Sequence, residues 1–182
     1  TTGSGSAQGW ETITLPFQPT KISHATKGEL VPFGRWSGTS DTKKPFWLYG
    51  FRSSGFTASN YLNANQPYII AMPNNTMYDD AYRVNGTVTF SATSATVNAS
   101  LQAVGSTNGV RTLRPAYETV QAAYDKYALN ANGSQFVTYR AANPFEAYSM
   151  TTESNARGFI DILDELPTGI ESIPTVGTDE TP

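Results

Sequence analysis

Gln66-Pro67-Tyr68-Ile69-Ile70-Ala71-Met72-Pro73-Asn74-Asn75 is the stretch that decides the fold of this chain. Tyr68 to Met72 form an apolar run long enough for one strand that is buried on both faces. Pro67 and Pro73 stand at its two ends, where the missing N–H of proline costs no ladder hydrogen bond. The two asparagines that follow tolerate left-handed backbone angles and predict a turn. The stretch therefore predicts a β-structured core, and it indicates no reaction.

The composition favours strands over helices. Of the 182 residues, 38% are hydrophobic and only 15% are charged. Thr, Ser, Asn, Gly and Tyr take the place of the missing charged residues. Thr and Tyr fit a pleated sheet, whereas Asn and Gly weaken helices. The length suits one large domain or two small fused ones, and either is large enough to bury a core.

Charge and cysteine content exclude several classes. With a net charge of −3 and no cluster of Lys or Arg, the chain lacks the groups that neutralise phosphates, so we expect no nucleic-acid partner. The absence of Cys excludes a disulfide scaffold, a thiol nucleophile and cysteine-based zinc sites. No apolar run approaches the length of a membrane span, and we expect no membrane insertion and no cofactor.

Several segments predict strands around the central stretch. Phe46 to Phe51 is apolar at both parities, so we expect it to pair with the central stretch in the middle of the core. Trp10 to Phe17 alternates, with Ile13, Leu15 and Phe17 on one face and Thr12 and Thr14 on the other. Both patterns are typical of a sheet.

Two Asn-Gly pairs predict hairpin turns. Asn85-Gly86 leads into a strand at Thr87 to Ala92, for which Thr96 to Leu101 is the expected partner. Asn132-Gly133 leads into Gln135 to Arg140. The remaining expected strands are Lys21 to His24, Gly28 to Phe33, Phe145 to Met150 and Arg157 to Leu163. Two further segments, Arg111 to Val120 and Ala123 to Leu129, are expected to pair antiparallel with each other.

These segments predict an all-β fold of roughly ten to thirteen short strands, at turn spacings of about 8–12 residues. We expect an antiparallel β-sandwich over residues 9–166, and a jelly-roll-like arrangement or two fused β lobes divided near Gly105 stay open as alternatives. Residues 1–8 resemble a linker or processed terminus, and residues 167–182 a C-terminal tail. If the protein is exported, its signal is expected upstream of this sequence.

The chain resembles a module of secreted or surface-exposed proteins in Bacteroidetes, which commonly follows leucine-rich or immunoglobulin-like repeats at the carboxyl end of multi-domain chains. The matching segments, in order, are Gly9 to Phe17, Phe46 to Tyr49, Gln66 to Asn75, Asn85 to Phe90, Asn143 to Tyr148 and Thr168 to Ile170. Relatives often carry Cys in place of Thr14 and Arg in place of Asn143. The resemblance implies a β-rich extracellular module and offers no catalytic residue to carry over.

Candidate catalytic residues have plain alternatives. His24 is the only histidine, and no nucleophile motif accompanies it, so a surface or turn histidine is the favoured interpretation. Glu118 and Glu146 lie in expected strands among aromatic residues and could form the two-carboxylate pair of a small glycoside hydrolase. The favoured alternative is that both face solvent from alternating strands.

Loop residues supply the candidate binding site. Trp36, Tyr78 and Tyr82 lie in expected loops, where exposed rings could stack on sugars. Asp79 and Asp80 could bond sugar hydroxyls or supply oxygen ligands to calcium, although a solvated acidic loop is the favoured alternative to a calcium site, and we predict no metal site. The Asn-x-Ser/Thr triplets at Asn74, Asn85, Asn98 and Asn132 are interpreted as turn chemistry.

The sequence thus predicts a non-enzymatic structural or adhesion module that is extracellular or at the cell surface. Its partner would be an extracellular protein or a glycan, and its oligomeric state is open. The alternatives are a carbohydrate-binding module and, third, a glycoside hydrolase using Glu118 and Glu146.

Overall fold

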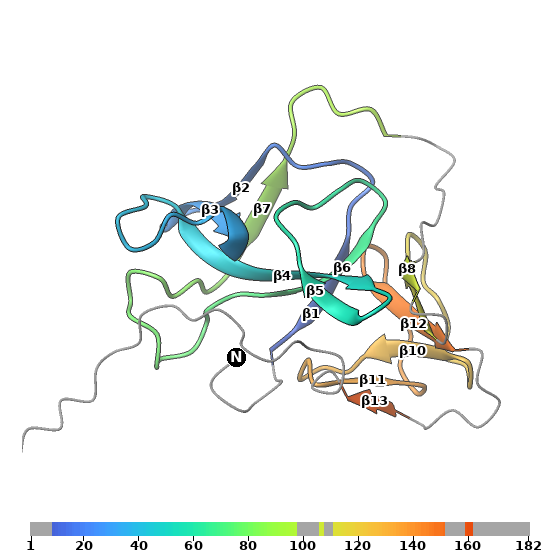
Figure 1. Ribbon diagram of the computed structural model, residues 1–182. Coiled ribbons are helices and arrows are strands. Elements are labelled where there is room, and N and C mark those ends of the chain that lie inside the picture. The colour runs from blue at the N-terminus through green and yellow to red at the C-terminus, as the bar shows by residue number, and fades with distance from the viewer. Residues whose placement is uncertain (1–8, 98–105, 108–110, 152–158, 162–182) are drawn as a thin grey trace, which may run out of the picture.

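The computed structural model describes residues 9–97, 106–107, 111–151 and 159–161, and these ranges hold two β-sheets and no α-helix (Figure 1). The first sheet has seven strands in the order β1-β6-β4-β3-β2-β7, with β5 paired to β4, and the second has six in the order β13-β11-β10-β12-β9-β8. The all-β prediction is confirmed. No helix in these ranges is long and apolar enough to cross a membrane.

The strands of the first sheet are β1 (Glu11–Thr14), β2 (Lys21–His24), β3 (Gly28–Pro32), β4 (Lys44–Arg52), β5 (Gly55–Ala58), β6 (Pro67–Ala71) and β7 (Val88–Ser91). The strands of the second sheet are β8 (Ser106–Thr107), β9 (Arg111–Pro115), β10 (Lys126–Leu129), β11 (Gln135–Val137), β12 (Ala147–Thr151) and β13 (Phe159–Asp161). A single 3-10 turn, η1 (Phe33–Arg35), lies between β3 and β4.

Strands β4 and β6 are neighbours inside the first sheet, as the sequence predicts. They pair antiparallel, with Trp47 opposite Ala71 and Gly50 opposite Tyr68. Every residue of β6 is buried, as is β4 from Pro45 to Phe51. Successive side chains of a strand point to opposite faces, so a strand covered on both sides is apolar at both parities.

The two faces of this pair belong to two separate cores. Phe46, Leu48, Tyr68 and Ile70 pack in the hollow of the first sheet with Ile22, Leu30, Leu62 and Val84. Trp47, Tyr49, Phe51 and Ile69 lie in a larger cluster to which the second sheet contributes Leu113, Tyr127, Leu129, Phe136 and Ala147. Burying one such large side chain contributes about 1.5–3 kcal/mol, so the shared cluster holds the two sheets together.

Strand β1 joins the two sheets. One edge pairs with β6, and on the other side Thr14 N–H donates to Phe145 O at 2.8 Å and Gly9 N–H to Asn132 O at 2.8 Å. The threonine face of β1 turns out to be the more deeply buried one, because it meets the second sheet. Thr14 is 0% exposed, whereas Ile13 is only partly buried.

Several expected pairings are wrong. Strands β9 and β10 do not pair with each other, because β12 lies between them and pairs antiparallel with both. Strand β3 pairs with β4 in parallel, so the first sheet is not purely antiparallel. Residues 106–107 form the short strand β8 beside β9, a pairing that the expected strands did not include.

The two Asn-Gly turns have different outcomes. The Asn132-Gly133 turn joins β10 to β11 as a hairpin, which confirms that prediction. Asn85-Gly86 makes no hairpin, because the strand after it, β7, pairs with the distant β2. The expected partner at Thr96 to Leu101 is not a strand at residues 96–97 and lies outside the described residues from 98 on.

The structure describes part of the remaining predicted segments. The linker at residues 1–8, the tail at 167–182 and the Asn98 triplet lie outside the described residues. The closing strand expected at Arg157 to Leu163 is represented by β13, which pairs with β11.

Candidate functional site

The loop predicted to bind ligands buries its aromatic rings. Tyr78 is 3% and Tyr82 7% exposed, and both belong to the core shared by the two sheets. Trp36 is partly buried and meets the Tyr82 ring edge to face at 5.8 Å between centroids. The expected exposure of the tyrosines is therefore wrong, since the loop folds back over β4 and its rings complete the core.

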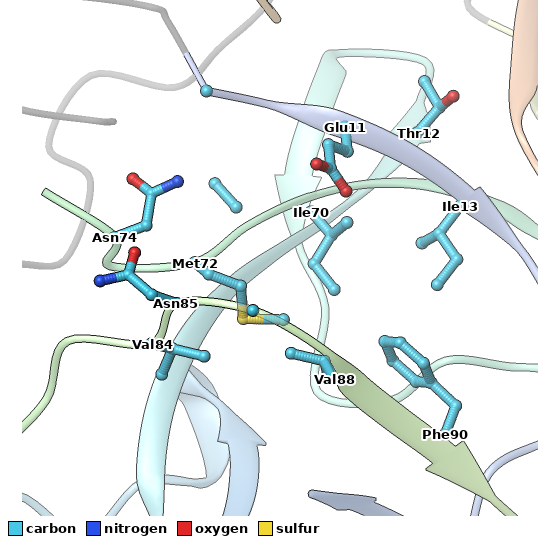
Figure 2. A pocket seen from close by; sticks show the side chains of 13 residues that line it. Glu11, Thr12, Ile13, Ile70, Met72, Asn74, Val84, Asn85, Val88 and Phe90 are labelled. Carbon is cyan, nitrogen blue, oxygen red and sulfur yellow. The ribbon is translucent and has the colours of Figure 1, made fainter. Parts of the chain in front are cut away.

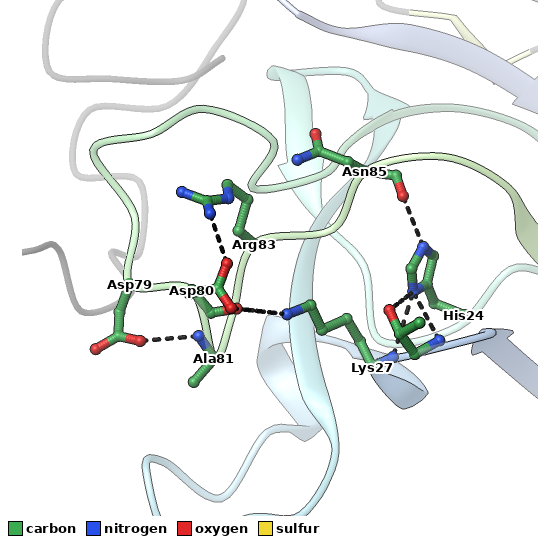
Figure 3. A network of polar contacts seen from close by, with 8 residues as sticks. His24, Lys27, Asp79, Asp80, Ala81, Arg83 and Asn85 are labelled. Carbon is green, nitrogen blue, oxygen red and sulfur yellow. Dashed lines mark hydrogen bonds and ion pairs between the residues drawn. The ribbon is translucent and has the colours of Figure 1, made fainter.

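The two aspartates of this loop remain at the surface and have local partners. Asp79 Oδ1 accepts the N–H of Ala81 at 2.8 Å. Asp80 pairs with Arg83 and, at 3.6 Å, with Lys27, whose Nζ also donates to the Asp80 backbone oxygen at 2.6 Å (Figure 3). In the described ranges, no three His, Cys, Asp or Glu side chains lie together as a metal-binding group.

His24 links two turns. Its Nε2 lies 2.8 Å from Asn85 O, and its Nδ1 lies 3.3 Å from the backbone nitrogens of Thr26 and Lys27 (Figure 3). A carbonyl oxygen only accepts, so Nε2 carries the proton and Nδ1 accepts from the two N–H groups. Both ring nitrogens thus have structural partners, and His24 is the last residue of β2, where the sequence favoured a surface or turn histidine.

The two candidate carboxylates lie outside strands, which corrects the sequence expectation. Glu118 is exposed in the segment after β9, and Glu146 immediately precedes β12. Glu146 Oε1 accepts from Arg140 Nη2 at 2.6 Å, and its Oε2 accepts the N–H of Asn143 at 2.9 Å. Glu146 therefore closes a turn and pairs with a cation.

A cleft of about 380 Å³ lies between β1 and β7, the two edge strands of the first sheet, and we name it the β1–β7 cleft (Figure 2). The sheet curls so that its outermost strands, β1 and β7, face each other across the opening. The apolar lining consists of Ile13, Ile70, Ala71, Met72, Val84, Val88 and Phe90. The polar lining consists of Glu11, Thr12, Asn74 and Asn85, with Gly9 and Gly86.

The alternation of β1 and β7 places side chains in this cleft. Figure 2 shows Ile13 of β1, Ile70 of β6, and Val88 and Phe90 of β7 around the same space, whereas Thr12 points away. Thr12 Oγ1 instead accepts the N–H of Ala147 in the second sheet, at 2.9 Å. The volume falls within the range of about 300–1000 Å³ that is typical of ligand sites.

A second cleft, of about 310 Å³, lies on the other side of β1, and we name it the Arg140 cleft. Its lining consists of Trp10, Glu11, Thr12, Leu129, Asn130, Ala131, Arg140, Pro144, Phe145 and Glu146. The Phe145 side chain is 52% exposed, and its backbone has φ 69°, which is uncommon for a bulky residue. Hydrogen bonds from Phe145 N–H to Ala116 O at 2.7 Å and from Thr14 N–H to Phe145 O hold it there.

Two described groups with displaced pKa values lie elsewhere. Hydrogen bonds from the backbone N–H groups of Lys43 and Ser37 hold the pKa of Asp41 below its ordinary value. Burial raises the pKa of Tyr117. Neither residue lines the β1–β7 cleft or the Arg140 cleft, and both shifts have a structural cause.

Sequence reasoning did not find either cleft. Each is assembled from segments far apart in the chain. Among their lining residues, the sequence had marked Asn74 and Asn85 as turn residues and Glu146 as a candidate carboxylate. Comparison with family models, with curated proteins and with solved structures finds no match to this chain.

Proposed function

We propose that this chain is a non-enzymatic, extracellular β-sandwich module of a bacterial surface protein, and that it adheres to a partner through the β1–β7 cleft. The observation that carries the proposal is the opening of the curled sheet, where an apolar floor meets a polar rim. Such a combination is typical of binding sites, in which apolar contact supplies affinity and a few polar groups supply orientation. The resemblance to Bacteroidetes modules supports export and surface location.

The contacts of the candidate catalytic groups favour binding over catalysis. Both nitrogens of His24 and both carboxylate oxygens of Glu146 have protein partners. Among the described residues, Glu11 is the only titratable side chain that lines the β1–β7 cleft, and it is exposed. General acid–base chemistry normally uses two groups with distinct roles, and this cleft offers one.

Adhesion of the isolated domain tests the proposal. Beads coated with the domain are offered to panels of extracellular matrix proteins, bacterial surface proteins and glycans. We expect retention on at least one protein surface, and loss of retention with Val88→Asp, which places a charge in the cleft. Glu118→Ala, at an exposed site outside both clefts, is the control. An absence of retention on every surface contradicts the proposal.

A carbohydrate-binding role is the second candidate, and the Arg140 cleft is the observation that favours it. The half-exposed Phe145 ring stands beside Asn130, Arg140 and Glu146, which supply hydrogen-bond donors and acceptors. Sugars are commonly held by one flat ring and several such groups. A glycan array tests this role, with Phe145→Ala expected to abolish any signal. Tyr124→Ala, which removes an 88% exposed ring outside the cleft, is the matched control.

A further inference from the structure

We propose that the β1–β7 cleft binds an extended peptide, which adds as a strand to the free edge of β7 and carries a Lys or Arg opposite Glu11. This inference rests on the proposed adhesion function and specifies its partner. It is carried by the unpaired backbone of β7, by the apolar floor beside it and by the charge of Glu11.

The free edge of β7 is the first part of the argument. Strand β7 pairs with β2 on one side, and no strand in the described ranges pairs with its other side. Ser91 O accepts the N–H of Thr20 at 2.9 Å and so points toward β2. Because backbone direction alternates along a strand, the N–H and C=O groups of Val88 and Phe90 point to the free edge.

The side chains of the same two residues point into the cleft. Val88 and Phe90 are partly buried against the core cluster that contains Leu48 and Ile70, while Thr89 and Ser91 are exposed. A peptide paired with the free edge would continue this alternation and place every second side chain over Ile70 and Met72. The sequence Thr87 to Ala92 contains no charged residue and no proline, which are the usual protections of an edge strand.

Strand β1, which forms the opposite wall of the cleft, has its backbone engaged elsewhere and does not pair with β7. The backbone of β1 pairs with β6 on one side, and on the other side Thr14 N–H donates to Phe145 O in the turn before β12. Residues of β1 therefore offer side chains to a guest, and the charged one is Glu11. No described residue forms an ion pair with Glu11, so a cationic side chain on the peptide supplies the missing partner.

The probe is a library of synthetic peptides of about seven residues with Val, Ile, Leu or Phe at alternate positions and Lys, Arg, Glu or Gln at each end. We expect saturable binding of peptides that carry a cation, with chemical-shift changes at the Val88 and Phe90 amides. N-methylation of the peptide at a residue whose N–H faces β7 should weaken binding by at least about tenfold. These residues alternate along the peptide, so N-methylation at the intervening positions should have smaller effects.

Glu11→Lys tests the charge without disturbing the core, since Glu11 is exposed. We expect this variant to bind cationic peptides about threefold or more weakly than the unmodified protein does, and to bind Glu-bearing peptides more tightly. Lys21→Glu, which lies at the end of β2 and outside the cleft lining, is the matched control, and unchanged melting temperatures verify the fold of both variants.

Four results overturn the inference. They are a library without binders, N-methyl effects that do not alternate, a cleft that takes lauric acid and excludes the peptides, and a dimer of the protein joined through β7. The adhesion function fails separately. If the domain is retained on protein surfaces and the bound peptides do not compete with that retention, the adhesion function stands and this inference fails. If the domain binds the peptides and is retained on no surface, this inference stands and the adhesion function fails.

Discussion

Gly133 lies so close to Trp10 that a Cβ atom added to the glycine would overlap the backbone nitrogen and oxygen of the tryptophan. Gly133 also has φ 69°, and its carbonyl accepts the N–H of Trp10 at 3.3 Å. The hairpin between β10 and β11 therefore docks on the start of β1 through bare backbone. This contact positions β1 between the two clefts.

Gly133→Ala should lower the free energy of unfolding by about 2–4 kcal/mol, because the methyl group adds a steric clash to a strained backbone angle. Equilibrium unfolding in urea measures the change. Gly28→Ala is the matched control, since Gly28 has φ 75° and no atom within 4 Å of an added Cβ. We expect about 1 kcal/mol there from backbone strain alone. Equal losses in the two variants would show that the approach to Trp10 contributes nothing.

Glu146→Ala should lower the free energy of unfolding by about 1–3 kcal/mol, because Arg140 and the N–H of Asn143 lose their acceptor in a partly buried site. Glu118→Ala makes the same chemical change at an exposed position and should stay within about 0.5 kcal/mol of the unmodified protein. Urea unfolding of both variants gives the comparison. A loss of hydrolytic activity in either variant, with stability unchanged, would instead favour the glycoside hydrolase.

The local part of the fold was predictable from the sequence. The buried strands β4 and β6 are apolar at both parities, and an Asn-Gly pair marks the turn at Gly133. Trp47, which belongs to the segment expected in the middle of the core, is 2% exposed. Each of these patterns depends on a residue and its near neighbours, which sequence periodicity reports directly.

The pairing of strands and the clefts were not predictable in the same way. Strand β12 separates β9 from β10, although it follows them in sequence, and no local pattern indicates such an insertion. Thr14 is polar yet fully buried, because its position on β1 faces the second sheet. The β1–β7 cleft depends on the curl of a whole sheet, and curl is set by tertiary packing.

Tyr82→Ala should lower the free energy of unfolding by about 3–5 kcal/mol, because the Tyr82 ring is buried in the shared core. Tyr124→Ala removes the same side chain at an 88% exposed site and should change stability by about 0.5 kcal/mol or less. Thermal and urea unfolding measure both. A small effect of Tyr82→Ala would indicate a ring that leaves the core readily, and would restore the loop of residues 74–82 as a stacking site.

Tyr117 joins the segment that follows β9 to the segment before β6. Its hydroxyl donates to Asn65 Oδ1 at 2.7 Å, and Asn65 N–H donates to Leu15 O at 2.7 Å. Tyr117→Phe keeps the ring and should cost about 1 kcal/mol at neutral pH. Asn65→Gly removes the same acceptor and retains a residue suited to φ 62°. If the hydrogen bond carries the effect, the double variant should be more stable than the sum of the two losses predicts.

The contribution of Tyr117 should also depend on pH. Burial raises the pKa of Tyr117 in the folded protein above the ordinary value of 10.0. The unfolded chain therefore releases this proton at lower pH than the folded protein does, and stability falls as pH rises above about 10. The difference in unfolding free energy between the unmodified protein and Tyr117→Phe should be constant from neutral pH to about pH 9 and should shrink above pH 10. Urea unfolding across that range measures the difference, and a gap that widens at high pH would mean that the folded state favours the ionised phenol.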